Sequence, residues 1–371
     1  MNILVDARCL SDEAGGIPRY VSSIISALAH RYRGHMFLLF FNGYKNTYPW
    51  KMRHYPSNCI AVQSTFPNKL FNISSSVLSR PTLDEITQKI TGVIPDAVFM
   101  PNINFVSVSS NIPIVLTIHD LSFHHYPKTF SWRSRLWHRY IGVASLIRRS
   151  ARIIAVSDHT RDEIIEQFDV DPHRVNAIPH ANTNQVDSGA MFSRDQLGVS
   201  DEYMIAPGMG AGRKNLDCLL DAWCLARQSS ASLSKMKLLI TGIQHGNNTP
   251  DSVLCIGTVP SDHYRALLSH ASAVVYPSRY EGFGFPILEA FAARTPVLAS
   301  SCSSIPEIGR DAFYPFDPYD VNSLALALMD ICNPAIADHF VNAGAAYAWK
   351  NSWDDAAIRT FNTIKEAYES K

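Results

Sequence analysis

The chain has 371 residues, of which 46% are hydrophobic and 18% charged, so its composition predicts a packed globular protein and excludes a disordered one. Its 33 Lys and Arg residues equal its 33 Asp and Glu residues, and zero net charge argues against a nucleic-acid-binding protein, which needs a basic surplus. At this length we expect two domains of about 150–200 residues each.

In the first half of the chain, apolar runs alternate with amphipathic segments. The start of the sequence reads directly into a strand, so we expect no signal peptide. A helix is predicted from Pro18, which suits a first helical turn, because apolar residues then recur on one helical face. The stretch 44–96 shows no regular pattern. Strands are predicted at 3–5, 36–41, 97–100, 114–117 and 153–156.

After Pro179 the pattern pauses through Gly189, which indicates a linker, and a second series of strands and helices follows. Two such series predict an α/β protein with two Rossmann-like domains that face a central cleft. We expect these domains at 1–185 and 186–350, with a final helix at 351–371 that packs back on the first domain. In the second series, strands are predicted at 203–205, 237–240, 252–254, 273–276 and 296–299.

The most informative stretch runs from Glu281 to Glu289, shortly after an apolar strand. Pro286 marks the first turn of a helix, so Glu281 is predicted in a loop and Glu289 one turn inside the helix. Gly282 and Gly284 allow close approach of a ligand, and free N–H groups at the helix start suit a phosphate. A carboxylate there can hold the diol of a ribose. The alternative is that the intervening phenylalanines are core and both glutamates face solvent.

Arg213 and Lys214 follow the glycine-rich turn 208–212 and are predicted to open an amphipathic helix. Two cations at a helix start oppose the preference set by the helix dipole. A bound anion would remove this conflict, because Arg and Lys both bind phosphate and stabilise a leaving diphosphate. The alternative is a solvated surface pair. The spacing is not that of a P-loop.

Two further candidates lie in the first half of the chain. Gly15 and Gly16 fall in a loop between a strand and a helix, where a glycine pair is by itself only a turn signal. His119 follows the strand at 114–117, where it can meet a substrate as hydrogen-bond donor or acceptor; alternatively, it is bonded within its loop. His124 and His125 lie nearby, but zinc-site spacings are missing, so we predict no metal.

These strings resemble the retaining glycosyltransferases of family 4, which have the GT-B fold. Residues 281–289 are similar to the family's E-x7-E motif, 295–307 to its continuation, and Arg213 and Lys214 to its R-K-N or R-K-G pair. The resemblance covers most of the chain and is weakest around 44–95. It implies that Glu281 contacts sugar hydroxyls, that Glu289 binds the ribose and that Lys214 contacts the diphosphate.

The resemblance also implies that His119 and Glu281 are catalytic, and that no metal or other cofactor is required. The first domain would lie on the acceptor side, and the second would bind the nucleotide sugar. The opening 6–20 is similar to the family's D-A-R…G-I-G-R-Y string, whose glycine loop borders the donor. The implied donor-binding residues are Gly15, Gly16, Arg213, Lys214, Gly282, Phe283, Gly284, Phe285, Leu288 and Glu289.

The expected reaction transfers a sugar from a nucleotide-sugar donor with retention of the anomeric configuration. The G-F-G-F-P variant at 282–286 resembles the mannosyltransferase branch that builds bacterial O-antigen or capsule polysaccharides. This implies GDP-mannose as the donor and a glycan or lipid-linked oligosaccharide as the acceptor. The alternatives are a UDP-sugar donor or a non-catalytic nucleotide-sugar-binding protein. A nicotinamide dehydrogenase is disfavoured because no G-x-G-x-x-G opens the first helix.

The stretch 132–152 is basic and aromatic. It could lie against an anionic membrane or a lipid-diphosphate acceptor, or it could be a domain helix with snorkelling arginines. The seven cysteines form no C-x-x-C pair, which favours a reduced compartment, and no apolar run approaches the roughly 20 residues of a membrane span. We therefore expect a cytoplasmic protein, which the basic stretch could place on the inner face of the membrane.

Overall fold

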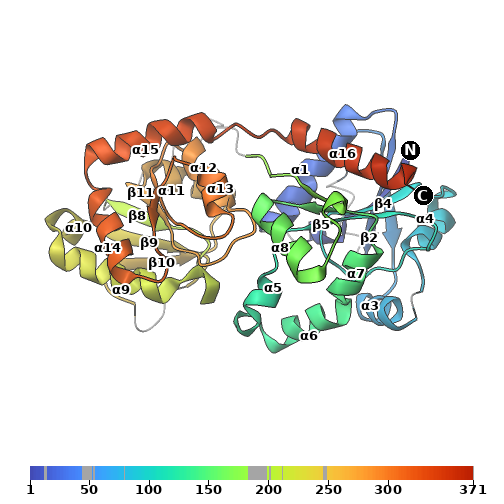
Figure 1. The fold of residues 1–371 in the computed structure, drawn as a ribbon, viewed down its shortest axis with the longest axis horizontal. Helices are drawn as coiled ribbons and strands as arrows, with labels where there is room; N and C mark the ends of the chain where they lie inside the picture. The colour runs from blue at the N-terminus through green and yellow to red at the C-terminus, as the bar shows by residue number, and fades with distance from the viewer. Residues whose placement is uncertain are drawn as a thin grey trace. The chain divides into compact units, whose positions relative to one another are not determined.

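The computed structural model describes residues 1–11, 15–43, 52, 55–78, 80–182, 199, 202–210, 212–244 and 249–370. The chain divides into two compact units (Figure 1). Unit 1 comprises Met1–Phe123, Ser131–Ala181 and Asn351–Lys371, and unit 2 comprises His124–Phe130 and Asn182–Lys350. The predicted domain boundary at residue 185 lies outside the described residues.

Unit 1 contains a seven-stranded parallel sheet in the order β3-β2-β1-β4-β5-β6-β7. Its central strands are buried along almost their whole length, because helices cover both faces, and this explains why they read as continuous apolar runs. The order reverses between β1 and β4, as in a Rossmann fold. The strands are β1 Asn2–Asp6, β2 Met36–Asn42, β3 Cys59–Ser64, β4 Ala97–Met100, β5 Ile114–Ile118, β6 Arg152–Ala155 and β7 Val175–Ala177.

The helices of unit 1 include the last helix of the chain, α16, which packs beside the first, α1. Phe361 stacks on Tyr32 with ring centroids 3.8 Å apart, and Arg31 pairs with Asp354 at 2.7 Å. Ser157 caps α8 through its side chain, as its position predicts. The helices are α1 Gly16–Arg31, α3 Asn68–Val77, α4 Leu83–Thr91, α5 Ser122–His125 (whose last two residues belong to unit 2), α6 Trp132–Ile141, α7 Val143–Arg149, α8 Asp158–Phe168 and α16 Trp353–Glu369; the 3-10 turns are Arg8–Ser11 and Pro172–Arg174.

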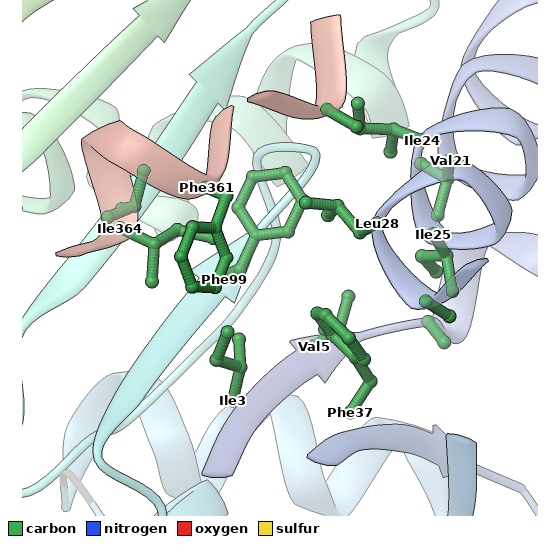
Figure 2. Close-up of a cluster of buried hydrophobic side chains, with 14 of the residues drawn as sticks. Ile3, Val5, Val21, Ile24, Ile25, Leu28, Phe37, Phe99, Phe361 and Ile364 are labelled. Atoms are coloured by element: carbon green, nitrogen blue, oxygen red, sulfur yellow. The ribbon is translucent and has the colours of Figure 1, made fainter. Parts of the chain in front are cut away.

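The main core of unit 1 lies between its sheet and the pair α1 and α16. Figure 2 shows Phe361 and Ile364 of α16 pointing toward Phe99 and toward the apolar face of α1. All of these side chains are essentially inaccessible to solvent. Residues more than 230 positions apart in sequence (Phe361 and Phe99, for example) therefore complete one core, and burial of such side chains stabilises the fold by about 1.5–3 kcal/mol each.

Unit 2 repeats the same arrangement with a six-stranded parallel sheet in the order β10-β9-β8-β11-β12-β13, which reverses between β8 and β11. The strands are β8 Tyr203–Ala206, β9 Lys237–Thr241, β10 Val253–Gly257, β11 Ala273–Tyr276, β12 Val297–Ser300 and β13 Tyr314–Phe316. The helices are α9 Leu216–Ser229, α10 Ala231–Lys235, α11 Ser261–His270, α12 Phe285–Ala292, α13 Ile305–Gly309, α14 Val321–Asp330 and α15 Pro334–Tyr347; the 3-10 turns are Pro127–Thr129 and Gly212–Lys214.

All ten predicted strands are confirmed, nine of them to within one residue at each end; β10 begins one residue later and ends three residues later than predicted. Three strands were not predicted from the sequence: β3, β7 and β13. The last two have three residues each, too few for a periodic signal. Among the described residues no single helix is long and apolar enough to span a membrane. Helices α14 and α15, which meet at an angle of 94°, reach the length and apolar composition of a span only when they are taken together.

Candidate active site

The site of unit 2 lies beyond the carboxyl ends of β8 and β11, where the strand order reverses. The loop after β8 carries Arg213 and Lys214, and the loop after β11 carries Glu281. These two strands are hydrogen-bonded neighbours, so their loops emerge side by side. This switch point is where open parallel sheets bind their ligands.

Glu281 forms ion pairs with both cations of the first loop. Its carboxylate lies 2.6 Å from Lys214 Nζ and 2.9 Å from Arg213, and its side chain is 8% exposed. Burial alone would raise the pKa of Glu281, but Lys214 and Arg213 outweigh this effect and lower the pKa to about 2. The carboxylate is therefore ionised at every physiological pH and accepts hydrogen bonds but donates none.

The predicted position of the two cations at the start of a helix is wrong. Arg213 and Lys214 lie on the 3-10 turn Gly212–Lys214, and α9 begins only at Leu216. They directly precede the N-cap of α9, Asn215, rather than lie within its first turn. Their charge is compensated in part by Glu281, which leaves one net positive charge on the three side chains.

Asn215 separates the cationic turn from α9. It adopts a left-handed conformation, with φ of 60°, and it is 3% exposed. Its amide nitrogen donates to the carbonyls of Pro277 and Pro318, at 3.1 and 2.7 Å. Asn is one of the few residues that tolerates this conformation, so Asn215 both turns the chain and ties the cationic turn to the loop after β11.

Two serines that precede α13 form hydrogen bonds with the backbone of the loop 281–284. Ser303 Oγ accepts from the N–H of Glu281 at 3.0 Å, and Ser304 Oγ donates to the carbonyls of Glu281 and Phe283 at 2.9 Å each. Ser304 is completely buried. Sequence reasoning placed these serines in a motif but gave them no role. Their geometry shows that they fix the backbone beside the charged cluster.

Helix α12 starts directly after this loop, and its first turn is confirmed near Pro286. Gly284 occupies the N-cap position with φ of 113°, which only glycine adopts without strain. Pro286 stands in the first turn and lacks an N–H, so it can donate to no ligand, and the N–H of Ile287 donates to the carbonyl of Gly284 at 3.0 Å. Glu289 lies one turn inside the helix, as predicted, and is 4% exposed. Of the other predicted donor-binding residues, Gly282, Phe283 and Leu288 are buried and Phe285 is half-buried.

The segment His124–Phe130 belongs to unit 2, although its neighbours in sequence belong to unit 1. His125 and Tyr126 place their rings 5.3 and 5.7 Å from the ring of Tyr280, the residue before Glu281. A Cβ on Gly212 would lie 2.4 Å from the Thr129 side chain, so a glycine is required there.

Among the described residues, no group of three or more His, Cys, Asp or Glu side chains is arranged to hold a metal.

The second cluster lies in unit 1, beyond the carboxyl ends of β4 and β5. His119 follows β5, as predicted, and its Nε2 lies 2.9 Å from the carbonyl of Pro101. A carbonyl only accepts, so Nε2 carries the proton and Nδ1 is left as an acceptor in the neutral ring. Burial lowers the pKa of His119, against the opposing effects of Pro101 and Asp120. The ring is therefore neutral at pH 7.

Sequence reasoning missed His180 as a member of this cluster. Its ring is centred 5.6 Å from that of His119 and 4.5 Å from that of Tyr20, and it stacks on Trp353. Burial, and then the charges of His119 and Arg19, lower the pKa of His180 well below its usual value.

Helix α1 connects the predicted glycine loop to this ring cluster. Gly15 is the N-cap of α1 with φ of 122°, and Gly16 is its first residue. Tyr20, one turn later, lies edge-on to His119 with ring centroids 4.9 Å apart, and its hydroxyl bonds to Thr117 at 3.2 Å. Gly15 thus precedes the helix from which Tyr20 contacts His119.

Comparisons with known proteins give a family match for each half of the chain. Residues 14–181 match the family "Glycosyltransferase Family 4", and residues 203–333 match "Glycosyl transferases group 1". The chain is 28% identical over 273 residues to O-antigen chain mannosyltransferase B of Escherichia coli, covering 68% of this chain and 70% of the relative. It is 25% identical over 249 residues to O-antigen chain mannosyltransferase RfbU of Salmonella typhimurium, covering 64% of this chain and 66% of that protein.

Solved structures with the same fold cover almost the whole chain. Sucrose-phosphate synthase of Thermosynechococcus elongatus superimposes with a TM-score of 0.70 at 18% identity, covering 100% of this chain and 99% of the other. The Anabaena protein HepE, solved in complex with UDP and glucose, gives 0.68 at 17% identity, covering 99% and 100%. Two Rossmann-like units with these neighbours show the GT-B fold. The chain belongs to the family 4 and group 1 glycosyltransferases, whose matches together span most of its length.

Proposed function

We propose that this glycosyltransferase transfers mannose from GDP-mannose to a glycan or lipid-linked oligosaccharide of a bacterial surface polysaccharide, with retention of configuration. The observation that carries the proposal is the pairing of Glu281 with Arg213 and Lys214 beside the first turn of α12. The choice of mannose is supported by the two O-antigen mannosyltransferases to which the chain is similar.

The charges of unit 2 suit the departure of a nucleoside diphosphate. Lys214 and Arg213 carry two positive charges against the single negative charge of Glu281, so an incoming diphosphate meets a net attraction. Preorganised cations and helix amides stabilise charge that develops on a leaving group, and each such donor contributes about a hundredfold to a thousandfold in rate. In this proposal the α12 amides and Lys214 hold the diphosphate, and Glu289 holds the ribose.

The state of Glu281 bears on the stereochemical course. Its pKa of about 2 keeps it ionised, so it does not act as a general acid. Two cations at 2.6 and 2.9 Å hold its lone pairs, which makes it a poor covalent nucleophile. It is suited instead to accept hydrogen bonds from sugar hydroxyls. We infer that retention proceeds by attack on the face from which the diphosphate leaves, through an oxocarbenium-like state.

His119 is suited to a complementary role in unit 1. Because Nε2 donates to Pro101, the neutral ring presents Nδ1 as an acceptor. We assign Nδ1 to a hydrogen bond from a hydroxyl of the transferred sugar. The neutral state at pH 7, produced by burial, is the state that this role requires. The reaction as proposed uses no metal or other cofactor, so activity should survive EDTA.

A second donor class has its own support. The Anabaena neighbour was solved with UDP and glucose. The roles proposed here assign side chains to the sugar, the ribose and the diphosphate, and none to a nucleobase. A UDP-sugar donor therefore remains the alternative within the same fold. A non-catalytic nucleotide-sugar-binding protein is the other alternative, and turnover distinguishes it.

The test begins with a thermal-shift panel of GDP, UDP, GDP-mannose and several UDP-sugars, because a ligand that binds only the folded state raises the melting temperature. The Lys214→Ala variant is the matched control for the site. A shift with guanine compounds that Lys214→Ala loses, followed by mannose transfer in a turnover assay, supports the proposal. A shift confined to uridine compounds overturns the donor, and no shift with any nucleotide overturns the site.

A further inference from the structure

Two aromatic rings contact the imidazole of His119 within unit 1, and a third ring packs on those two. Tyr20 lies edge-on to His119 with ring centroids 4.9 Å apart, and the ring of His180 is centred 5.6 Å from that of His119. Tyr20 and His180 also contact each other, at 4.5 Å. The indole of Trp353 lies 6.0 Å from Tyr20 and 6.1 Å from His180. Aromatic rings attract one another at these separations, so the four rings pack as one cluster.

The hydrogen bond of His119 does not by itself fix the plane of its ring. Nε2 lies 2.9 Å from the carbonyl of Pro101, and this contact holds one atom of the imidazole. The direction of Nδ1, which we assign to a sugar hydroxyl, also depends on how the ring turns about that atom. Misplacement of a reacting group by about 1 Å can lower a rate about a hundredfold, so the rings that confine His119 bear on the reaction.

Tyr20 is fixed to the strand that leads to His119. Its hydroxyl forms a hydrogen bond with Thr117 Oγ1 at 3.2 Å, and Thr117 belongs to β5. The position of Tyr20 beside His119 is therefore set by α1 and β5, two elements of the sheet layer on which His119 itself depends.

His180 depends instead on a distant part of the chain. The chain leaves unit 1 after Ala181 and returns to it at Asn351. Asn351 Nδ2 donates to the backbone carbonyl of His180 at 3.2 Å. The ring of Trp353, the first residue of α16, stacks on that of His180 with an interplanar angle of 26°. The returning chain thus holds the ring of His180 against His119.

The ring of His180 contributes shape and not charge. Burial lowers the pKa of His180 well below its usual value, and the charges of His119 and Arg19 lower it further. The imidazole is therefore uncharged at pH 7. Its contact with His119 is a packing contact between two neutral rings, which another planar ring of similar size can reproduce.

We propose that His180 is a positioning residue of the transfer reaction: its ring holds that of His119 in the plane that directs Nδ1 to the donor sugar, and Trp353 and Asn351 hold His180 in turn. The inference rests on the proposed function of His119 and adds a residue that acts through it. The start of α16 then supports the reacting groups, in addition to the part that α16 takes in the core of unit 1.

A merely structural role for His180 predicts a different result. If His180 only stabilised unit 1, the effect of removing it on turnover would add to that of removing His119. If it acts through His119, its removal has no further effect once His119 is gone. The two roles are therefore separated by combining the two substitutions.

The first test measures the release of GDP from GDP-mannose below the melting temperature of every variant. His180→Ala should lower kcat about tenfold, and no more than His119→Ala does. In the His119→Ala background, His180→Ala should change kcat by less than about twofold. Additive losses would overturn the positioning role and leave the proposed function of His119 intact. No loss in His119→Ala itself would overturn that proposed function.

The second test replaces the ring instead of removing it. His180→Phe keeps a planar ring without the two nitrogens, so it should recover most of the kcat that His180→Ala loses. Trp353→Phe should likewise be faster than Trp353→Ala. If His180→Phe were as slow as His180→Ala, the nitrogens of His180 and not its packing would matter, and the proposal would be wrong.

The matched control is Tyr32→Ala. Tyr32 stacks on Phe361 at 3.8 Å, so this change removes an aromatic contact of the same helix α16 at a position remote from the ring cluster. It should lower the melting temperature and leave kcat unchanged. A fall in kcat as large as that of His180→Ala would show that any loosening of α16 slows the reaction, which contradicts a specific role for His180.

A spectroscopic readout tests the position of His119 without any donor. In protein labelled with ¹⁵N-histidine, the Nε2–H of His119 that donates to Pro101 should give a signal that His119→Ala removes. The signal should persist in Tyr32→Ala and be lost by exchange with water in His180→Ala, because the ring is no longer confined. An unchanged signal in His180→Ala would show that His119 is held without His180, and the proposal would fail.

Discussion

The two units place their functional side chains at the same topological position but use opposite chemistry. In unit 2 the loops after β8 and β11 bring together three charges, which compensate one another within 3 Å. In unit 1 the loops after β4 and β5 bring together neutral rings, in which His119 lies against Tyr20 and His180. The shared strand order fixes where the site lies, and the side chains decide what it binds.

The difference follows from what burial does to each kind of group. Buried charges persist only if they are paired, and Glu281 remains ionised because two cations surround it. Burial instead lowers the pKa of the imidazoles of His119 and His180, which therefore lose their proton. The first arrangement is suited to an anionic diphosphate, and the second to an uncharged sugar. Five measurements can break or sharpen this contrast.

The largest effect is expected for Lys214→Ala. This change removes a cation that we assign to the leaving diphosphate, so kcat/KM should fall about a thousandfold. Steady-state kinetics with GDP-mannose provide the measurement, with Lys235→Ala, an exposed lysine of the same unit, as the control. A fall of less than about tenfold would mean that unit 2 does not act through this charge.

Glu281→Gln should separate transfer from nucleotide binding. Transfer should fall about a hundredfold, because the ionised acceptor for sugar hydroxyls is lost. GDP itself should bind at least as tightly as before, because Arg213 and Lys214 no longer share their charge with a carboxylate. Calorimetric titration with GDP beside the rate assay checks both. Weaker GDP binding would show that the ion pairs organise the site rather than compete with the ligand.

His119→Ala should have a smaller effect, because it removes a neutral hydrogen-bond acceptor and not a charge. We expect kcat/KM to fall about tenfold to a hundredfold. The control is His173→Ala, an exposed histidine of the same unit. If His119→Ala were as damaging as Lys214→Ala, the proposed division between a charged and an uncharged site would be wrong.

Asn215→Ala tests the scaffold of the charged cluster. Two carbonyls lose their donor, and alanine is strained at φ of 60°, so the free energy of unfolding should fall by about 2–3 kcal/mol. Thermal melting measures the change. Asn215→Gly keeps the backbone conformation accessible and should lose less stability than Asn215→Ala; an equal loss would assign the whole effect to the amide.

The smallest expected effect is on the pH dependence of stability. Unit 1 should determine it near pH 6.5 and unit 2 below pH 4.5. The pKa values of His119 and His180 are lowered in the folded state, so the unfolded state binds more protons below pH 6.5 and stability falls as the pH drops through that value. Glu281, with its pKa lowered from 4.5 to about 2, contributes stability that is lost only as the pH falls below 4.5. The difference between melting curves at pH 7.5 and 5.5 should therefore narrow in His180→Asn, which keeps the contribution of His119, but not in Glu281→Gln. A result with the two variants exchanged would contradict the assignment.

Much of the fold could be predicted from the sequence because a doubly wound sheet makes its buried strands apolar throughout. The strands 36–41 and 273–276 are visible for this reason. Strand β3 was missed because Cys59–Ser64 is an edge strand, and it contains exposed Ile60 and polar Gln63. Its burial pattern reflects one neighbour rather than two, so the apolar signal is weaker.

The members of the charged cluster could be predicted, but not their arrangement. Lys214 and Glu281 stand 67 positions apart, and only the pairing of β8 with β11 brings them together. The sequence suggested that Arg213 and Lys214 require a bound anion. In the fold, the carboxylate of Glu281 already forms ion pairs with both. His180 illustrates the same limit, since its role depends on Tyr20 and Trp353 at opposite ends of the chain. The predicted roles of the donor-binding residues stay predictions until the variants above are measured.

The return of α16 to unit 1 has a consequence for the order in which the protein can be made. A ribosome releases Ile3, Val5 and the apolar face of α1 long before Phe361 and Ile364, yet all of them share one core (Figure 2). Unit 2 ends at Lys350, so all of it is synthesised before α16. It can therefore fold while translation continues. The nascent first unit must instead keep an unfinished apolar surface until the last helix emerges, which makes it the part of the chain that a chaperone would recognise.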